Sequence, residues 1–282
     1  TIPWVTDSSP PTPSTSESDI IDIYKNIIVG KRITGNEVRH CIPRYNWEVN
    51  QVWTAYSDVV DSNTLKALNS KFYVVTDEFH VYKCLSNNNG AVSTVKPTGT
   101  PTTGAPFTTA DKYVWKYMYS VSAEDQLLFT TSDFIPVKTL AIADGSTQWS
   151  VQSQATPGAL YVIKVTNGGT GYTSTPTVTI YGDGFNATAT AVRDPATNTI
   201  KSITVVDPGY GYSRSTIYIT GGGGKDAKAI GVISPQGGHG SDPVSELGGS
   251  YLMLSVVLKG TENNKVPVGN DFRQVAVISD PL

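Results

Sequence analysis

The sequence predicts a mainly β protein: a layered β-sandwich framework with short helical insertions and one inserted, duplicated β-repeat module. Composition is the first reason. Only 16% of the 282 residues are charged, whereas Gly (26), Pro (17) and Tyr (15) are plentiful, a balance typical of many strands joined by turns. The second reason is apolar–polar alternation in several segments, and the third is an internal duplication near the middle of the chain.

Charge and cysteine usage exclude several function classes. The net charge of −3 gives no bulk attraction for nucleic acid or anionic membranes, and no apolar run reaches the ~20 residues of a membrane span. Cys41 and Cys84 are expected to be small buried residues, since their spacing does not establish a disulfide. Together with three scattered histidines they form no zinc-ligand spacing, so we expect neither metal nor cofactor.

A helix is predicted over residues 18–29. Ser16 or Ser18 can cap its start, and Gly30 suits the position just past its end. Apolar residues recur at the spacing of one helix face, which we expect to lie in the core; they are Ile20, Ile21, Ile23, Tyr24, Ile27 and Ile28.

Strands are predicted where β-branched and aromatic residues are bounded by turn residues. Residues 71–76 and 80–85 form a hairpin through Asp77-Glu78, whereas residues 49–56 fit either a strand or a short helix. Residues 96–110 are expected to be a surface loop. Further strands are expected at residues 132–137, at 251–258 as a buried strand, and at 275–279.

The segment Asp111–Tyr119 is the densest aromatic stretch. Read at period two, four rings share one face, and Val114, Lys116 and Met118 share the other. Such a face needs a large partner surface. We expect Trp115 in the core and the tyrosines to approach an interface with another protein; these are Tyr113, Tyr117 and Tyr119.

Residues 159–234 contain a duplication with a period of about forty residues. In each copy a strand is followed by a Gly-x-Gly-Tyr turn, a second strand, a glycine turn and a strand of small residues. Glycine permits positive φ in such turns, and the tyrosine after the turn can close over the sheet end. The turn residues are Gly169, Gly171 and Tyr172 in the first copy, and Gly209, Gly211 and Tyr212 in the second.

Three polar motifs invite chemistry, and each has a simpler interpretation. Residues 221–225 are glycine-rich and end in Lys225, but no Ser or Thr and no helix pattern follow, so a repeat turn is favoured over a phosphate loop. His239 lies near a serine and an aspartate, but neighbours on a glycine loop are not a rigid catalytic triad. Asp183 and Asp226 could bind Ca²⁺, although turn aspartates usually bond the backbone. The sequence therefore predicts no catalytic residue.

Four short sequence motifs, which we call stations, resemble in their order along the chain the baseplate wedge subunit encoded by gene 8 of T-even-like contractile-tailed phages. That family has an I-P-R-x-x-W station, a V-Y-[KR]-C-L strand, a Y-V-W-[EK]-Y strand and a terminal F-R-Q station followed by N-P or D-P. Here the stations are Ile42–Trp47, Val81–Leu85, Tyr113–Tyr117, and Phe272–Val275 with Asp280-Pro281. The chain departs from the family at its start, at its end, and in the repeat at 159–234.

The resemblance implies a non-enzymatic virion protein located in the tail baseplate and assembled in the host cytoplasm. It also implies a homodimer that binds other wedge proteins and rearranges when the sheath contracts, with no nucleic-acid partner and no membrane span. Interface centres favour Tyr, Trp and Arg. The candidates are Trp4, Arg44, Tyr45, Trp47, Tyr113, Tyr117, Tyr119, Phe272 and Arg273. Arg44 could also make cation–π contacts with Tyr45 and Trp47.

The domain prediction divides the chain into 1–158, 159–234 and 235–282, with 1–17 as an extended arm. Residues 1–158 and 235–282 together form the framework, and the repeat module is inserted between them. Two alternatives remain open. The module could bind a receptor or glycan with Tyr172 and Tyr212 as exposed platforms, or the chain could be a hydrolase that uses His239 and a distant acid.

Overall fold

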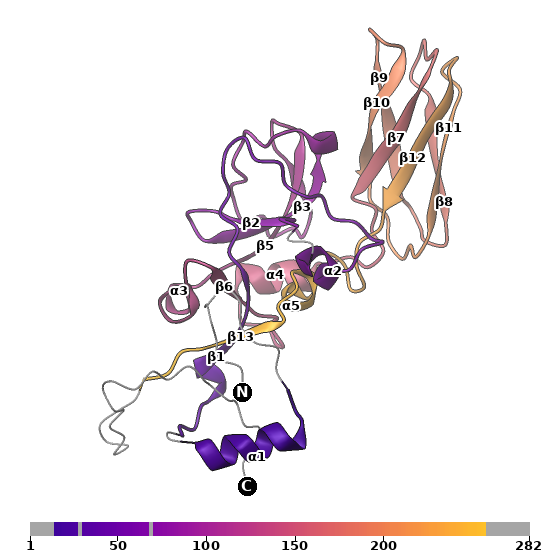
Figure 1. The fold of residues 1–282 in the computed structure, drawn as a ribbon. Coiled ribbons are helices and arrows are strands. Elements are labelled where there is room, and N and C mark those ends of the chain that lie inside the picture. The colour runs from indigo at the N-terminus through magenta and orange to yellow at the C-terminus, as the bar shows by residue number, and fades with distance from the viewer. Residues whose placement is uncertain (1–13, 28–29, 68–69, 258–282) are drawn as a thin grey trace.

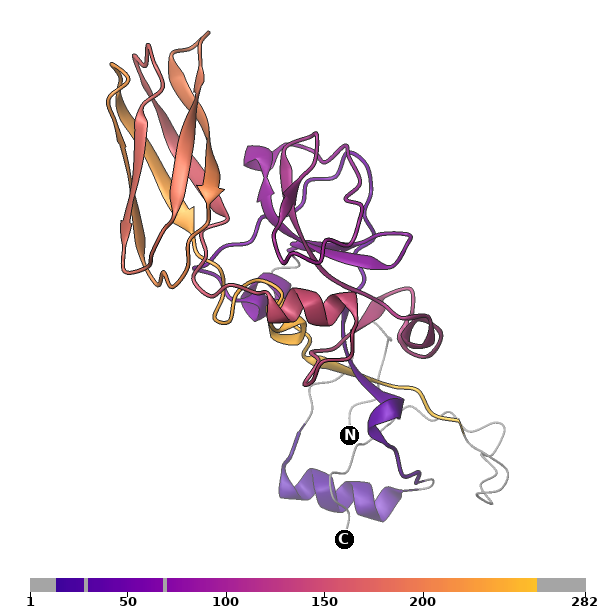
Figure 2. The ribbon, with the colours of Figure 1, turned by 180° about the vertical axis from the view of Figure 1, so that it is seen from behind.

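The computed structural model describes residues 14–27, 30–67 and 70–257. Strand accounts for 36% of the chain and helix for 16%, in four antiparallel sheets with short helices, which confirms the mainly β class. Figure 1 shows the framework sheets and, beside them, an elongated body made by β7 to β12. Figure 2 gives the same arrangement from behind. Trp4, Phe272, Arg273 and the strand expected at 275–279 lie outside the described residues.

Two sheets build the framework. The larger has the order β2-β3-β5-β4 and the smaller β13-β1-β6. The predicted hairpin at 71–85 is present as β2 and β3, and the strand predicted at 132–137 is present as β6. The larger sheet comprises β2 (Tyr73–Val75), β3 (His80–Asn87), β5 (Tyr113–Ser120) and β4 (Phe107–Thr108); the smaller comprises β13 (Tyr251–Leu254), β1 (Val38–Pro43) and β6 (Phe134–Val137).

The helices are short, and side chains cap most of them. Ser16 caps α1 by accepting from the Asp19 amide, as the sequence predicts, and Asp242 caps α5 by accepting from the Ser245 amide. The helices are α1 (Glu17–Asn26), α2 (Ser62–Ala67), α3 (Ala123–Phe129), α4 (Thr147–Ser153) and α5 (Pro243–Glu246), with 3-10 turns η1 (Gly35–Glu37) and η2 (Asn88–Gly90).

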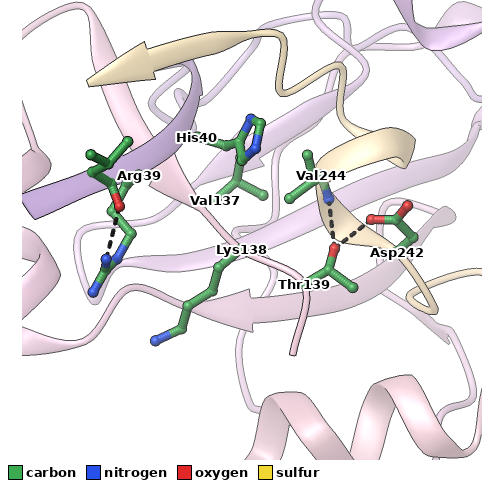
Figure 3. A pocket seen from close by; sticks show the side chains of 8 residues that line it. Arg39, His40, Val137, Lys138, Thr139, Asp242 and Val244 are labelled. Atoms are coloured by element: carbon green, nitrogen blue, oxygen red, sulfur yellow. Dashed lines mark hydrogen bonds between the residues drawn. The ribbon is translucent and has the colours of Figure 1, made fainter. Parts of the chain in front are cut away.

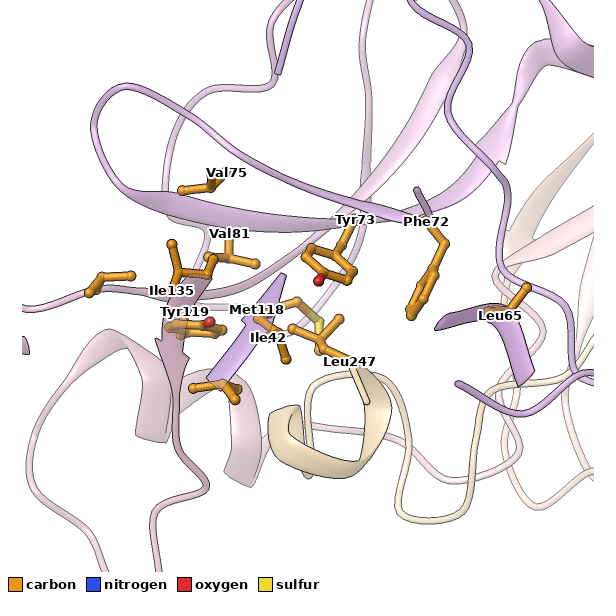
Figure 4. Packing of buried hydrophobic residues seen from close by; sticks show 12 residues of the cluster. Ile42, Leu65, Phe72, Tyr73, Val75, Val81, Met118, Tyr119, Ile135 and Leu247 are labelled. Carbon is orange, nitrogen blue, oxygen red and sulfur yellow. The ribbon is translucent and has the colours of Figure 1, made fainter. Parts of the chain in front are cut away.

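The larger sheet is buried on both faces because alternate residues enter two separate cores. Tyr73, Val75 and Val81 point into the first core, which Ile42 and Leu247 complete from β1 and the end of α5 (Figure 4). The second core takes the opposite face of the sheet together with residues of other segments. It contains Trp53, Val74, Tyr82, Cys84, Tyr113, Trp115, Tyr117 and Val151.

The aromatic strand is the main correction to the sequence prediction. All four rings of β5 are at most 2% exposed, which counts against an interface role for Tyr113, Tyr117 and Tyr119. Their hydroxyls are satisfied internally: Tyr119 donates to the Pro136 carbonyl at 2.8 Å, and Tyr113 donates to the Ala91 carbonyl. The four rings do not share one face, since register shifts in the β3–β5 pairing place Tyr119 in the first core.

Predictions for three further segments fail: the helix α1, the strand β13 and residues 49–56. Helix α1 ends at Asn26, so Gly30 is not its cap, and none of its residues is buried. Strand β13 is an edge strand that leaves Leu252 exposed, rather than a buried strand. Residues 49–56 are neither strand nor helix apart from one bridge between Gln51 and Ser93. Periodicity identifies a face, but it does not show that anything covers that face.

The β-repeat module, residues 159–234, has the predicted strand–turn–strand plan in both copies. Its strands form a four-stranded sheet of order β12-β7-β10-β9 and a two-stranded sheet of β11 and β8. Every pairing joins a strand of the first copy to a strand of the second, so neither copy forms a sheet alone. The first copy comprises β7 (Val162–Thr170), β8 (Thr177–Gly182) and β9 (Thr188–Asp194); the second comprises β10 (Thr199–Asp207), β11 (Ser215–Thr220) and β12 (Lys225–Val232).

The repeated turns depend on glycine, as the sequence predicts. Gly169 and Gly209 have φ of 64° and 61°. A Cβ on Gly169 would lie 2.4 Å from the Lys225 carbonyl oxygen, and one on Gly209 would lie 2.3 Å from that of Phe185. The matching contacts arise because the two copies are structurally equivalent. Gly171 and Gly211 also have positive φ, 77° and 75°.

Candidate interaction surfaces and a buried charged cluster

Four ionisable side chains meet in the framework where the chain returns from the module. We call them the charged cluster: Lys83, Lys116, His239 and Glu246. Lys83 and Lys116 are register partners on β3 and β5. The Lys83 ammonium lies 2.9 Å from the Glu246 carboxylate, with side chains 1% and 5% exposed, and the Gly240 amide donates to the other carboxylate oxygen at 2.7 Å.

The protonation states follow from burial and from the neighbouring charges. Burial opposes ionisation of Glu246 more strongly than any single neighbour favours it, but the charges and hydrogen bonds of Lys83 and His239 together lower the pKa of the carboxyl to about 2. Burial, aided by Lys83, lowers the pKa of His239 to about 4, so the imidazole is neutral at pH 7. Burial also lowers the pKa of Lys116 to about 8, and its ammonium donates to the Gly104 carbonyl.

The charged cluster holds chain segments together. Tyr56 lies between two of its members: the Lys83 ammonium is 4.2 Å from the ring centroid, and the His239 ring meets it edge-on at 4.7 Å. The Tyr56 hydroxyl donates to the Ile233 carbonyl at the base of the module. The serine and aspartate near His239 have other partners, because Ser241 bonds Gly238 and Asp242 caps α5. The geometry is that of a structural clamp.

An open pocket of about 490 Å³ lies between β1, the end of β6 and the start of α5. Its cations are already paired: Arg39 and Lys138 contact the Asp125 carboxylate at 2.9 and 3.3 Å. Figure 3 shows Thr139 bonded to the Asp242 carboxylate and to the Val244 amide. The charged side chains that line the pocket are therefore already engaged with groups of the protein itself. The described part of the chain contains no group of three His, Cys, Asp or Glu side chains placed to hold a metal ion.

The first resembling station lies in a half-buried strip beside β2. Arg44 stacks on the Phe79 ring, 5.6 Å from its centroid, instead of on Tyr45 or Trp47 as expected. Its guanidinium also donates to the Thr131 carbonyl at 3.1 Å. Tyr45 packs on Tyr73 with ring centroids 5.2 Å apart, and the Trp47 indole donates to the Ser93 hydroxyl at 3.2 Å. These residues line the core, and only part of each reaches solvent.

The tyrosines proposed as glycan platforms are buried in the module. Tyr172 and Tyr212 are 1% and 6% exposed, and each ring packs on a glycine of the opposite copy, Gly224 and Gly184 respectively. The alternative that uses these two rings is therefore wrong. Cys41 and Cys84 are buried, as the sequence predicts, and no disulfide joins them; burial raises the pKa of Cys84.

Helix α1 exposes the largest continuous apolar stripe of any described helix. Ile20, Ile21 and Tyr24 are 45%, 45% and 52% exposed, and Ile27, the residue that follows the helix at its C-cap, is 52% exposed. Figure 1 shows the helix standing apart from the framework sheets. A lone helix of ten residues is marginal in water, and the described residues leave this stripe exposed, so it is a candidate contact surface.

A second exposed apolar patch lies beside Trp47. The bridge between Gln51 and Ser93 brings Val52 and Val92 opposite each other, both partly exposed, with Val49 nearby in the chain. We call these three residues the valine patch. It adjoins the first resembling station, because Ser93 of the bridge accepts the hydrogen bond from the Trp47 indole.

Neither a protein-family model nor a curated protein nor a solved structure matches this chain. The described helices include none with the length and apolar character of a membrane span. The geometry of the surfaces above, together with the resembling stations, is therefore the basis for a functional proposal.

Sequence reasoning missed the charged cluster. The sequence offered one signal for it: each of two otherwise apolar strands has a lysine near its middle, Lys83 in one and Lys116 in the other. A lysine that is buried needs a partner for its charge. The partner, Glu246, is 163 residues from Lys83 in the chain, and nothing in the local pattern points to it.

Proposed function

We propose that this protein is a structural subunit of a phage tail baseplate wedge, which binds neighbouring baseplate proteins during assembly and sheath contraction. The observation that carries the proposal is the stripe on α1. It exposes four large apolar side chains and buries none within the described chain. Exposed apolar stripes of this kind are typical of helices that pack on another subunit.

The resembling stations add support. Val81–Leu85 and Tyr113–Tyr117 lie on adjacent strands with Cys84 opposite Trp115, and Asn46 of the first station bridges to Val75 on β2. Three stations that are distant in sequence thus occupy one sheet region. This is the expected result if they mark a common structural core.

On this proposal the protein is a non-enzymatic component of the virion baseplate, assembled in the host cytoplasm. It forms a homodimer and contacts other wedge proteins, with no nucleic-acid partner. The described charged groups agree with a non-enzymatic role, since the one dense cluster is buried and internally paired.

The test is light scattering of the purified chain, followed by co-purification with the other wedge subunits of its phage. The proposal predicts a dimer that retains at least one wedge protein through affinity and size-exclusion steps. A monomer that retains none of them would overturn it.

A further inference from the structure

The outer face of the two-stranded sheet in the module carries an exposed aromatic pair. Tyr181 on β8 and Tyr218 on β11 are 60% and 52% exposed, and their rings meet edge to face, with centroids 5.3 Å apart at 89°. Inward positions alternate with them and pack in the module core. The other outward positions are all threonines: Thr177, Thr179, Thr216 and Thr220.

The duplication supplies an internal control for these tyrosines. With Gly182 matched to Gly221, Tyr181 corresponds to Thr220, and Tyr218 corresponds to Thr179. The same fold thus accepts threonine at both positions. Tyr172 and Tyr212, by contrast, occur in both copies and are buried, as expected of residues that folding requires. The fold therefore does not require two large rings on this face.

We propose that this face, Tyr181 and Tyr218 with the four threonines, binds a neutral carbohydrate. Aromatic rings pack against the C–H faces of sugars, and tyrosine and threonine hydroxyls both donate to and accept from sugar hydroxyls. None of the six outward side chains is charged, whereas an acidic sugar or a phosphate calls for Arg or Lys. The nearby Arg214 guanidinium lies 3.9 Å from the Asp183 carboxylate, so its charge is partly offset.

A protein partner fits this face less well. The centres of protein interfaces also favour tyrosine, but they add arginine and methionine and seldom contain threonine. This face has four threonines and neither arginine nor methionine. The binding also extends beyond the assembly role, because it uses the module and leaves α1 and the valine patch free.

The module provides a matched control in its other exposed aromatic pair. Phe185 and Tyr210 are 60% and 50% exposed, with ring centroids 5.7 Å apart, and they correspond to Lys225 and Thr170 of the opposite copy. Their backbones pair with each other in an isolated bridge, outside the threonine-lined sheet. They offer similar ring area without the hydroxyl-bearing face.

The experiment is saturation-transfer NMR on the full chain with maltohexaose, cellohexaose, mannohexaose and chitohexaose. We expect at least one of these to bind with millimolar or tighter affinity. The double variant Tyr181→Thr/Tyr218→Thr copies residues that the fold already carries, and should weaken binding at least tenfold. The control Phe185→Lys/Tyr210→Thr should bind like the wild type.

Three results would overturn the inference. They are the absence of binding by all four oligosaccharides to the folded wild type, equal binding by the Tyr181/Tyr218 variant, and equal weakening in the control. If the Tyr181/Tyr218 variant instead loses a co-purifying virion protein while no oligosaccharide binds, the face is a protein surface and the carbohydrate proposal is wrong. Each outcome leaves the wedge proposal standing, because the α1 test is independent.

Discussion

The framework and the module reach stability by different means. The framework has two cores of large, individually placed side chains and a buried ion pair between segments far apart in the chain. The module has a thin core of isoleucine, alanine and valine, with the buried Tyr172 and Tyr212 beside glycines, and every strand pairing is made between copies. The framework therefore depends on unique contacts and the module on repeated ones. Changes that break one class of contact should leave the other region intact.

This contrast is measurable because all five tryptophans lie outside residues 159–234. Tryptophan fluorescence reports unfolding of the framework. Far-UV circular dichroism adds the strand signal of the module, so comparison of the two separates the regions.

The largest expected effect follows Glu246→Ala. Removal of one partner leaves the Lys83 ammonium buried and unpaired, which typically costs about 3–5 kcal/mol. Urea unfolding followed by tryptophan fluorescence should show that loss for the framework. The double variant Lys83→Met/Glu246→Ala should recover part of it, and Arg214→Ala on the module surface should leave both transitions in place. Equal losses in the single and double variants would refute the clamp.

The next largest effect should be a loss of framework stability at acidic pH. The unfolded chain carries an ordinary histidine of pKa near 6.5, whereas burial lowers the pKa of His239 to about 4 in the folded state. Between these values only the unfolded chain binds the proton, so framework stability falls by roughly 3 kcal/mol as the pH drops from 6.5 to 4. Glu246, with its pKa lowered to about 2, adds a further loss between pH 4.5 and 2.

The measurement is urea unfolding by tryptophan fluorescence at a series of pH values from 7 to 4. His239→Gln should flatten the slope above pH 4.5, because it removes the titrating group. A slope that is unchanged in this variant would show that another group controls it.

In the module the corresponding test is Gly209→Ala. Its Cβ would lie 2.3 Å from the Phe185 carbonyl oxygen at a φ of 61°, so the module should lose about 2 kcal/mol or more. Gly169→Ala should cost a similar amount, since its environment is equivalent. Gly211→Ala is the control: its Cβ meets nothing within 4 Å, which leaves only the positive-φ cost of about 1 kcal/mol. A large tryptophan-detected loss in any of the three would contradict independent regions.

The smallest effect on stability should come from α1. Replacement of Ile20, Tyr24 and Ile27 by serine removes side chains that are about half exposed, so both transitions should move by less than about 0.5 kcal/mol. Circular dichroism and fluorescence check this in one urea titration. A loss of several kcal/mol would mean that the stripe packs within the chain.

The parts that the sequence predicted are those with local causes. The repeat was read correctly because a turn with positive φ and close backbone contacts favours glycine, and Gly169 and Gly209 recur in matching positions. The cap at Ser16 is local too. The aromatic face of β5 was misjudged because register shifts against β3 move Tyr119 into the other core. The sequence of β5 contains no residue that predicts these shifts. The charged cluster was missed because its ion pair joins Lys83 to Glu246 across most of the chain.

The helix α1 shows the same limit from the other side. Its pattern correctly predicts a helix with one apolar face, but no local signal says which surface covers that face. The prediction of a core position assumed a partner within the chain. In the described structure the apolar stripe is exposed to solvent, so it is a candidate surface for contact with another protein.

The central claim, that α1 docks on another baseplate subunit, is tested most directly by co-purification of the Ile20→Ser/Tyr24→Ser/Ile27→Ser variant with wedge proteins. The matched control, Asp22→Ser/Lys25→Ser, changes the polar face of the same helix. We predict that the triple variant folds normally and loses the wedge proteins that the wild type and the control retain. Retention of those proteins by the folded triple variant would contradict the claim.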